Sequence, residues 1–167
     1  MKSNNIILTG FMGSGKSTVG RKLAKELKTY FIDTDVLIES FENRTISEIF
    51  DKEGENSFRK LEKECFEWIK NHVTSTIISV GGGLPVFVPE IKEAGFVIYL
   101  KVEFEEILKR MDNNEIKKRP LFRDKKKAYE LFLKRDKIYE KLADIIIENK
   151  NLNATVSKIK DYYADKR

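Results

Sequence analysis

The chain has 167 residues, of which 41% are hydrophobic and 35% charged, and its formal net charge is +5. This length fits a single domain with a core of its own, so we expect residues 1–167 to form one domain. One cysteine excludes an internal disulfide, and the longest apolar run, residues 96–100, is far short of the roughly 20 residues of a membrane helix, so we expect a cytoplasmic protein with no membrane partner.

Five short segments are almost continuously apolar, and we predict that they form strands: residues 5–9, 30–33, 76–80, 96–100 and 144–148. A continuous apolar run, in place of alternation with polar residues, is typical of parallel strands that helices cover on both faces. We therefore expect all five strands to be buried in the middle of the fold.

Amphipathic stretches separate the predicted strands. Apolar residues recur at helical spacing in three of them: Val19, Leu23 and Leu27; Phe58, Leu61, Cys65, Trp68 and Ile69; Leu152, Val156, Ile159 and Tyr163. Strands that alternate with helices in this way predict an α/β fold with a parallel sheet. We interpret Cys65 and Trp68 as core residues, and His72 as a helix cap or a solvent-facing side chain.

Residues 10–18, with the sequence GFMGSGKST, follow the first predicted strand and match the pattern G-x-x-x-x-G-K-[ST]. Glycines let the backbone turn tightly and bring its N–H groups against phosphate oxygens. The positive end of a helix beginning near Lys16 favours the same anion. The Lys16 ammonium can reach the β- and γ-phosphates, and the Ser17 hydroxyl can ligate Mg²⁺. The motif predicts a nucleoside triphosphate site.

Two carboxylates, Asp33 and Asp35, lie at the end of the second predicted strand. In open α/β sheets, ligands bind beyond the carboxyl ends of the strands, so both acids should face the same crevice as the phosphate loop. An acid there can orient the water ligands of Mg²⁺ or accept the proton of an attacking hydroxyl. For Asp35, capping of the following helix is an equally good explanation.

Two further features have both a functional and a purely structural interpretation. Three glycines, Gly81, Gly82 and Gly83, follow the third predicted strand and would either let a ligand touch the backbone or form a flexible turn. Arg59 and Glu62 lie three residues apart on one helical face. The carboxylate could hold the guanidinium in a fixed orientation, or the two could form an exposed ion pair.

The basic excess is confined to one segment. Residues 109–127 hold nine basic and three acidic residues, a net charge of +6, so the remainder of the chain carries −1. Because the excess is local, we expect no nucleic-acid partner. The segment is either a solvated helix face or loop, or a lid that handles anions such as phosphates.

The order of these motifs strongly resembles the shikimate kinase family. The resemblance runs from about residue 5 to residue 144, and these segments carry it: the phosphate loop, Asp33-Thr34-Asp35, Ser47-Glu48-Ile49-Phe50, Gly54-Glu55, Phe58-Arg59 with Glu62, the glycines at 81–83, Arg119-Pro120-Leu121, and Arg135 with Tyr139. Two places depart from the family pattern. Asn43 and Arg44 stand before Thr45, where the family usually has glycine, and Lys137 stands where it usually has proline.

The resemblance implies a three-layer P-loop fold, in which helices flank a five-stranded parallel sheet, with a mobile lid at about residues 110–125 and a substrate-binding region at about residues 34–62. The implied reaction transfers the γ-phosphoryl group of ATP to the 3-hydroxyl of shikimate. Its products are shikimate 3-phosphate and ADP, in aromatic amino-acid biosynthesis. Mg²⁺ would be the cofactor, ATP and shikimate the small-molecule partners, and the enzyme would act as a monomer.

The resemblance also implies roles for individual residues. The nucleotide would be held by Gly13, Ser14, Gly15, Lys16, Ser17, Thr18, Arg110 and Arg119, with Ser17 also on Mg²⁺. The catalytic residues would be Lys16, Asp33, Asp35 and Arg119. Shikimate would be held by Asp35, Arg59, Gly81, Gly82, Gly83 and Arg135, with the two arginines on its carboxylate. The sequence has no strong signature for adenine contacts near residues 147–150, and it leaves open which of the two aspartates accepts the proton.

Two other hypotheses fit the phosphate loop. The chain could be another small-molecule P-loop kinase, acting on gluconate or a nucleoside monophosphate, but the two arginines and the triple glycine favour shikimate. It could also be a P-loop binding protein without turnover, whose lid could hold nucleic acid. Intact Lys16, Ser17, Asp33 and Asp35 argue against that loss of activity.

Overall fold

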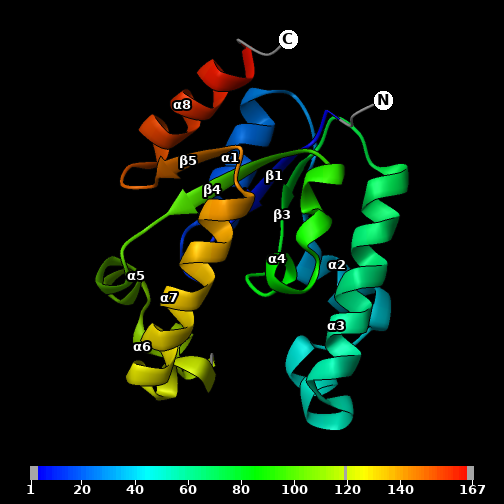
Figure 1. The fold of residues 1–167 in the computed structure, drawn as a ribbon, viewed down its shortest axis with the longest axis vertical. Helices are drawn as coiled ribbons and strands as arrows, with labels where there is room; N and C mark the ends of the chain where they lie inside the picture. Colours follow the sequence, from blue (N-terminus) through cyan, green and yellow to red (C-terminus); the bar gives the residue numbers. More distant parts are fainter. Residues whose placement is uncertain (1–3, 119, 165–167) are drawn as a thin grey trace.

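The computed structural model describes residues 4–118 and 120–164, and it contains one five-stranded parallel sheet (Figure 1). The strands run in the order β2-β3-β1-β4-β5 across the sheet. Their bounds are Ile6–Thr9 (β1), Phe31–Asp33 (β2), Ile77–Ser79 (β3), Phe96–Lys101 (β4) and Ile145–Glu148 (β5). All five predicted strands are therefore confirmed, each to within one or two residues at its ends.

Helices connect the strands, as crossovers between parallel strands require. The α-helices are Lys16–Glu26 (α1), Thr34–Glu42 (α2), Ile46–His72 (α3), Leu84–Phe87 (α4), Phe104–Arg110 (α5), Asn113–Lys118 (α6), Lys125–Leu142 (α7) and Leu152–Ala164 (α8), and two 3₁₀ helices span Pro89–Glu93 (η1) and Pro120–Arg123 (η2). Within the described part of the chain, no helix has the length and apolar character to span a bilayer.

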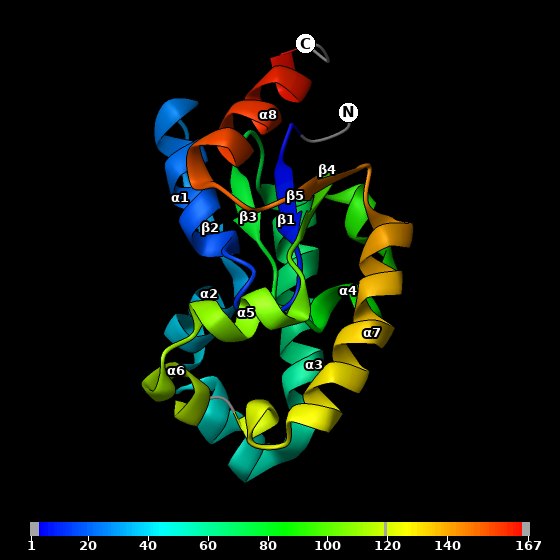
Figure 2. The ribbon, with the colours of Figure 1, turned by 90° about the vertical axis from the view of Figure 1, so that its left-hand side faces the viewer.

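The helices cover the two faces of the sheet and form three layers (Figure 2). Alternate residues of β1 point to opposite faces: Ile6 and Leu8 pack with α1 and α8, whereas Ile7 packs with α3, α4 and η1. Side chains of a parallel strand alternate between faces, so both faces of β1 must be apolar to be buried. This arrangement confirms the expected α/β fold with helices on both faces.

The edge strands are less buried than predicted. In β5, Ile146 is 47% exposed and only Ile147 is fully buried, and all three residues of β2 are half-buried. Both strands lie at the edges of the sheet, where helices cover them incompletely. The core assignment of Trp68 is also wrong, because its side chain is 48% exposed and stacks on the solvent-exposed His72. Phe66 is the buried aromatic residue of that part of α3.

A separate aromatic cluster joins the phosphate loop to the basic segment. Phe11, the second residue of the loop, contacts Phe122 of η2 and Phe132 of α7 edge-to-face, with ring centroids 6.1 and 5.3 Å apart. Phe104 of α5 packs on the same two rings. Aromatic contacts therefore attach the phosphate loop after β1 to α5, η2 and α7, which follow β4.

The junction between α2 and α3 explains one departure from the family pattern. Asn43 ends α2 in the left-handed conformation, with φ +50°, which asparagine adopts more readily than most residues other than glycine. Thr45 then begins α3 with a reciprocal capping box to Glu48. Inside α3, Gly54 has φ +82° and divides the element by a kink. The chain can therefore turn sharply here without a glycine at position 43.

Candidate active site

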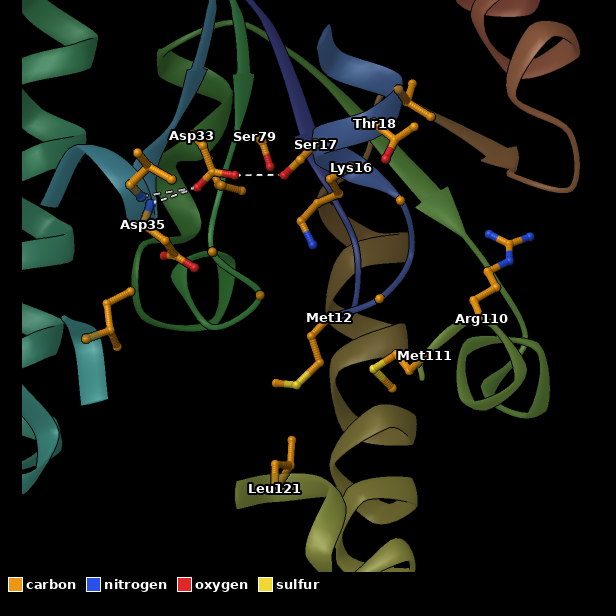
Figure 3. A pocket seen from close by; sticks show the side chains of 18 of the residues that line it. Met12, Lys16, Ser17, Thr18, Asp33, Asp35, Ser79, Arg110, Met111 and Leu121 are labelled. Carbon is orange, nitrogen blue, oxygen red and sulfur yellow. Dashed lines mark hydrogen bonds between the residues drawn. The ribbon is translucent and has the colours of Figure 1, made fainter. Parts of the chain in front are cut away.

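The carboxyl ends of the strands open into a cleft of about 1520 Å³. One part of its wall comes from the phosphate loop after β1, and another from the start of α2 and of α3. The turn after β3, the end of α5, Leu121 of η2 and the loop after β5 also contribute. A crevice at this edge of an open α/β sheet is where such folds bind their ligands, and Figure 3 shows the side chains that point into it.

The phosphate loop has the backbone that its glycines predict. Gly13 and Gly15 have φ angles of +80° and +89°, a region that residues with a Cβ rarely adopt. The loop leads into α1 at Lys16, as expected from the motif. The Lys16 ammonium donates to the carbonyl oxygens of Gly10 and Phe11, at 2.8 and 3.2 Å, and so lies across the hollow of the loop. An anion there would meet backbone N–H groups, a helix N-terminus and a cation.

Asp33 connects the second strand to the phosphate loop. One carboxylate oxygen accepts from the Ser17 hydroxyl at 2.8 Å, and the other accepts from the backbone N–H of Asp35 and Val36 (Figure 3). Asp33 is thus the N-cap of α2, so the capping explanation applies to Asp33 and not to Asp35.

The pair of Ser17 and Asp33 fits a magnesium ion. Magnesium in kinases is usually held by one or two protein oxygens together with substrate phosphates and water, so a hydroxyl and a carboxylate beside a phosphate loop suit it. Among the residues that the structure describes, no group of three or more histidine, cysteine, aspartate or glutamate side chains could hold a metal without such help.

Asp35 lies at the other side of the cleft from the phosphate loop. Its Oδ1 atom is buried and accepts no hydrogen bond from the described residues. Burial raises the pKa of Asp35 to about 6, with a further contribution from the charge of Asp33, while Lys16 and Arg59 oppose part of the shift. An unpaired carboxylate with a raised pKa in a cleft is typical of a functional group.

The glycine turn after β3 is a meeting point of charged side chains. A Cβ on Gly81 would lie 2.6 Å from Oδ1 of Asp35 and 3.0 Å from Oε1 of Glu62. On Gly83 it would collide with the guanidinium of Arg59, and on Gly82 it would lie 3.4 Å from the guanidinium of Arg135. A side chain at Gly81 or Gly83 would displace the carboxylate of Asp35 or the guanidinium of Arg59, so this turn is packed against charged groups and is not merely a flexible loop.

Arg59 is held from several sides. Its guanidinium donates to Glu62 at 2.5 Å and to Glu55 at 3.0 Å, and it stacks over the ring of Phe87, 4.4 Å from the centroid. The Glu62 side chain is 1% exposed and the Arg59 side chain 15% exposed. The two therefore do not form an exposed ion pair on the helix surface, which was the alternative interpretation of their spacing. Burial raises the pKa of Glu62, and Arg59 opposes that shift.

Arg135 reaches the same turn from α7. Its Nε atom is buried without an acceptor among the described residues. Tyr139, one helical turn later, is fully buried and donates its hydroxyl proton to the Gly82 carbonyl at 2.6 Å. Arg59 and Arg135, 76 positions apart in the sequence, therefore approach adjacent residues of one turn.

Arg110 lies at the opposite end of the cleft from Asp35 (Figure 3). It donates to the backbone carbonyl of Asn149 at 2.6 Å and pairs with Glu106. Arg119, which we predicted to belong to the lid, lies outside the described residues.

Sequence reasoning missed two residues of this region. Asn149 lines the cleft and contacts the phosphate loop, and the rule that ligands gather at strand ends could have found it, since it directly follows a predicted strand. Phe87, which stacks on Arg59, lies four residues beyond the triple glycine and has no pattern that identifies it.

Comparison with known proteins decides the family. The family model described as "Shikimate kinase" matches residues 12–164. The chain belongs to the shikimate kinase family. A shikimate kinase of Clostridium botulinum (strain Okra / Type B1) is 46% identical over 160 residues, which cover 93% of each protein. One of Helicobacter hepaticus is 42% identical over 143 residues, or 86% of this chain and 85% of the relative.

A solved structure gives the same family. Shikimate kinase from Acinetobacter baumannii in complex with shikimate matches with a TM-score of 0.89 at 34% identity, over 99% of this chain and 95% of that one. The expected three-layer P-loop fold, with its five-stranded parallel sheet, is thus the fold of the shikimate kinase family.

Proposed function

We propose that the chain is an ATP-dependent shikimate kinase, which transfers the γ-phosphoryl group of ATP to the 3-hydroxyl of shikimate. The observation that carries the proposal is the convergence of Asp35, Arg59 and Arg135 on the glycine turn after β3, beside a complete phosphate loop. Membership of the shikimate kinase family supports it. So does the related Acinetobacter baumannii enzyme, whose structure is described as a complex with shikimate.

The acceptor end has the chemistry that shikimate requires. Shikimate is a carboxylate with three hydroxyls, and an arginine binds a carboxylate through two parallel charge-assisted hydrogen bonds. Arg59 and Arg135 would hold the carboxylate, and the backbone of the glycine turn would contact the ring, since no Cβ intervenes. Asp35 would bind the hydroxyl that reacts, because its free oxygen faces this turn.

The donor end has the chemistry that ATP requires. Backbone N–H groups of residues 13–18 would bind the phosphates, and Lys16 would neutralise charge that develops on the γ-phosphoryl group. Ser17 and Asp33 would hold Mg²⁺, which neutralises phosphate charge when bound. Arg110 would lie near the adenine end, where the loop after β5 closes the cleft.

Phosphoryl transfer then needs positioning and one proton acceptor. Asp35 would accept the proton of the 3-hydroxyl, because its raised pKa brings it nearer to working pH while leaving it ionised at pH 7. Asp33 is less suited to this task, since both of its oxygens already accept hydrogen bonds. Arg119, in a lid at about residues 110–125, would close over the phosphates, and we expect a monomer of one domain in the cytoplasm.

A coupled assay of ADP release tests the proposal. Purified protein is given ATP and Mg²⁺ with shikimate, gluconate or AMP as the acceptor, and ³¹P NMR identifies the product. We expect turnover with shikimate alone, with a phosphate monoester as product and no release of ADP by Lys16→Ala. Turnover with gluconate or AMP would assign the chain to another kinase class. ATP binding without turnover on any acceptor would indicate a binding protein.

A further inference from the structure

Asn149, the first residue after β5, is a buried polar side chain that the proposed reaction does not use. Its side chain is 6% exposed, and both ends of its amide are engaged. Nδ2 donates to the backbone carbonyl of Ser14 in the phosphate loop at 2.7 Å, and Oδ1 accepts from the Thr155 hydroxyl of α8 at 2.9 Å. Because a carbonyl can only accept, the amide NH₂ must face Ser14, so the orientation of the side chain is determined.

The backbone of Asn149 is tied down as well. Its N–H donates to the Lys101 carbonyl at the end of β4, at 2.9 Å, and its carbonyl accepts from Arg110 at 2.6 Å. One residue therefore connects the phosphate loop, the end of β4, helix α5 and helix α8. The side chain cannot shift without breaking a hydrogen bond in a buried place, where an unmade bond is costly.

The hydrogen bond from Asn149 to Ser14 fixes the orientation of the peptide bond between Ser14 and Gly15, which is part of the phosphate loop. A peptide bond is planar and trans, so its C=O and N–H point in opposite directions. When Asn149 holds the Ser14 carbonyl, the N–H of Gly15 in the same peptide must point away from Asn149. Gly15 lines the cleft whereas Ser14 is fully buried, so the hydrogen bond holds the buried end of this peptide and leaves its Gly15 end at the cleft.

The glycine at position 15 follows from the same contact. Its φ of +89° needs glycine, and a Cβ there would lie 2.7 Å from Nδ2 of Asn149. The loop and the asparagine are thus packed directly together, without room for another side chain between them.

We propose that Asn149 is a positioning residue for the polyphosphate of the nucleotide: it fixes the Ser14–Gly15 peptide, and through Arg110 it links the phosphate loop to the adenine end of the cleft. The inference rests on the proposed function in taking a nucleoside triphosphate as the ligand, with its adenine near Arg110. It predicts that loss of the Asn149 side chain weakens nucleotide binding while the acceptor site, at the other end of the cleft, keeps its affinity.

Three variants separate the contacts. Asn149→Asp keeps the shape and replaces the donor to Ser14 by an oxygen, Asn149→Ala removes both side-chain hydrogen bonds without adding charge, and Thr155→Val removes only the support of the amide. Asn151→Asp is the matched control. It makes the same change two residues later, where the exposed side chain caps α8 by accepting from the Ala154 N–H, a bond that aspartate also makes.

The primary measurement is calorimetric binding of ADP with Mg²⁺ to the folded full-length chain, followed by the KM values of ATP and shikimate. We expect Asn149→Asp and Asn149→Ala to weaken ADP binding about 10- to 100-fold, and Thr155→Val about threefold. Asn151→Asp should bind ADP like wild type. The KM of shikimate should stay within about twofold of wild type in all four variants, a split that general destabilisation would not produce.

Unchanged ADP affinity in folded Asn149→Asp and Asn149→Ala would overturn the inference, as would equal losses for ADP and shikimate. If both fail to fold, Thr155→Val decides by the same criterion, with unchanged ADP affinity as the contradicting result. The outcome is independent of the acceptor: weakened ADP binding in a chain that does not phosphorylate shikimate would contradict the proposed function alone.

Discussion

The donor and acceptor halves of the cleft are built in opposite ways. The donor half is built around one contiguous loop, whose shape depends on the positive φ angles of Gly13 and Gly15. The acceptor half consists of Asp35 of α2, which lines the cleft, and of side chains of α3 and α7 that pack on the glycine turn after β3. A site made of backbone depends on local sequence, whereas a site made of side chains depends on the tertiary structure that brings them together.

The two halves also differ in electrostatics. The donor half offers Lys16 and Arg110 to an anion. The acceptor half combines acids with arginines: Asp35 and Glu62 have raised pKa values, and Arg59 and Arg135 lie close to them at the glycine turn. Burial disfavours an isolated charge, so each of these groups depends on the others or on a ligand. We therefore expect changes in the donor half to act on turnover, and changes in the acceptor half to act on substrate affinity and pH dependence.

The largest effect is expected from Lys16→Ala. The substitution removes the cation that would meet developing charge on the γ-phosphoryl group, so kcat should fall about 100- to 1000-fold or more. The Lys16 side chain lines the cleft, where its ammonium donates to the carbonyl oxygens of Gly10 and Phe11, so the melting temperature should change little. Activity within a few-fold of wild type would contradict the catalytic role of the loop.

Arg59→Ala and Arg135→Ala should separate the two halves most clearly. Removing one partner of a desolvated charge pair costs about 2–5 kcal/mol, or roughly 30- to 5000-fold in affinity or rate for shikimate. The affinity for ATP should remain almost unchanged. Arg59→Lys should recover only part of the loss, since an ammonium cannot make the paired hydrogen bonds of a guanidinium. Loss of ATP affinity with normal dependence on shikimate would contradict the carboxylate clamp.

The pH dependence should come from the acceptor half. The pKa of Asp35 is raised to about 6, and its ionised form is the one that accepts a proton, so kcat/KM for shikimate should fall about tenfold per pH unit below pH 6. Asp35→Asn should have little activity, and its remaining activity should not decrease in this way below pH 6. If kcat/KM of the wild type did not change between about pH 5 and pH 8, Asp35 would not be the proton acceptor.

The raised pKa of Asp35 also affects folding stability. Activity should rise with pH, whereas the stability that Asp35 contributes should fall. Because the folded pKa lies above the value of 3.8 in the unfolded chain, the stability that Asp35 contributes is fully present below about pH 4 and is lost as pH rises through about 6. Asparagine mimics the neutral form, so Asp35→Asn should be more stable than wild type at pH 8 by up to about 3 kcal/mol. Urea unfolding at pH 5 and pH 8 measures this, and an Asp35→Asn variant no more stable at pH 8 would contradict it.

The smallest effect is expected from Phe87→Ala. The half-exposed ring of Phe87 stacks on Arg59, and a cation–π contact at such a site is worth about 0.5–1 kcal/mol. The KM of shikimate should rise about two- to fivefold, and Phe87→Tyr should restore it. Phe41→Ala, at a ring on α2 that is 85% exposed, is the control and should change nothing. An equal effect of both alanine variants would show that the stack has no role.

The sequence predicted the phosphate loop, the start of α1 and Asp33, but it did not predict Asn149, which holds the loop through Ser14. The motif at residues 10–18 fixed the loop, the start of α1 at Lys16 and the neighbouring strand end at Asp33, because all of these depend on contacts close in the chain or on the rule for strand ends. The five strands and their helices followed from apolar patterns. The exceptions were Trp68 and the edge strands, where an apolar pattern alone does not tell which face a helix covers.

The acceptor half could not be derived from local pattern. The hydrogen bond from Tyr139 to Gly82 spans 57 positions and that from Asn149 to Ser14 spans 135. No spacing rule connects such residues, so Arg59 and Arg135 were paired only through the family resemblance. The burial of Glu62 also depends on how α3 packs against the turn after β3. Sequence alone therefore cannot tell whether Glu62 and Arg59 form an exposed ion pair or a buried one that fixes the guanidinium.

The most direct test compares shikimate with an analogue in which a neutral amide replaces the carboxylate. The ratio of the two kcat/KM values is measured for wild type, Arg59→Ala, Arg135→Ala and Lys16→Arg, the last being a change in the donor half. We predict that wild type and Lys16→Arg prefer shikimate by at least about 30-fold, and that both arginine variants lose most of that preference. A preference that is equal in all four proteins would contradict a carboxylate clamp formed by Arg59 and Arg135.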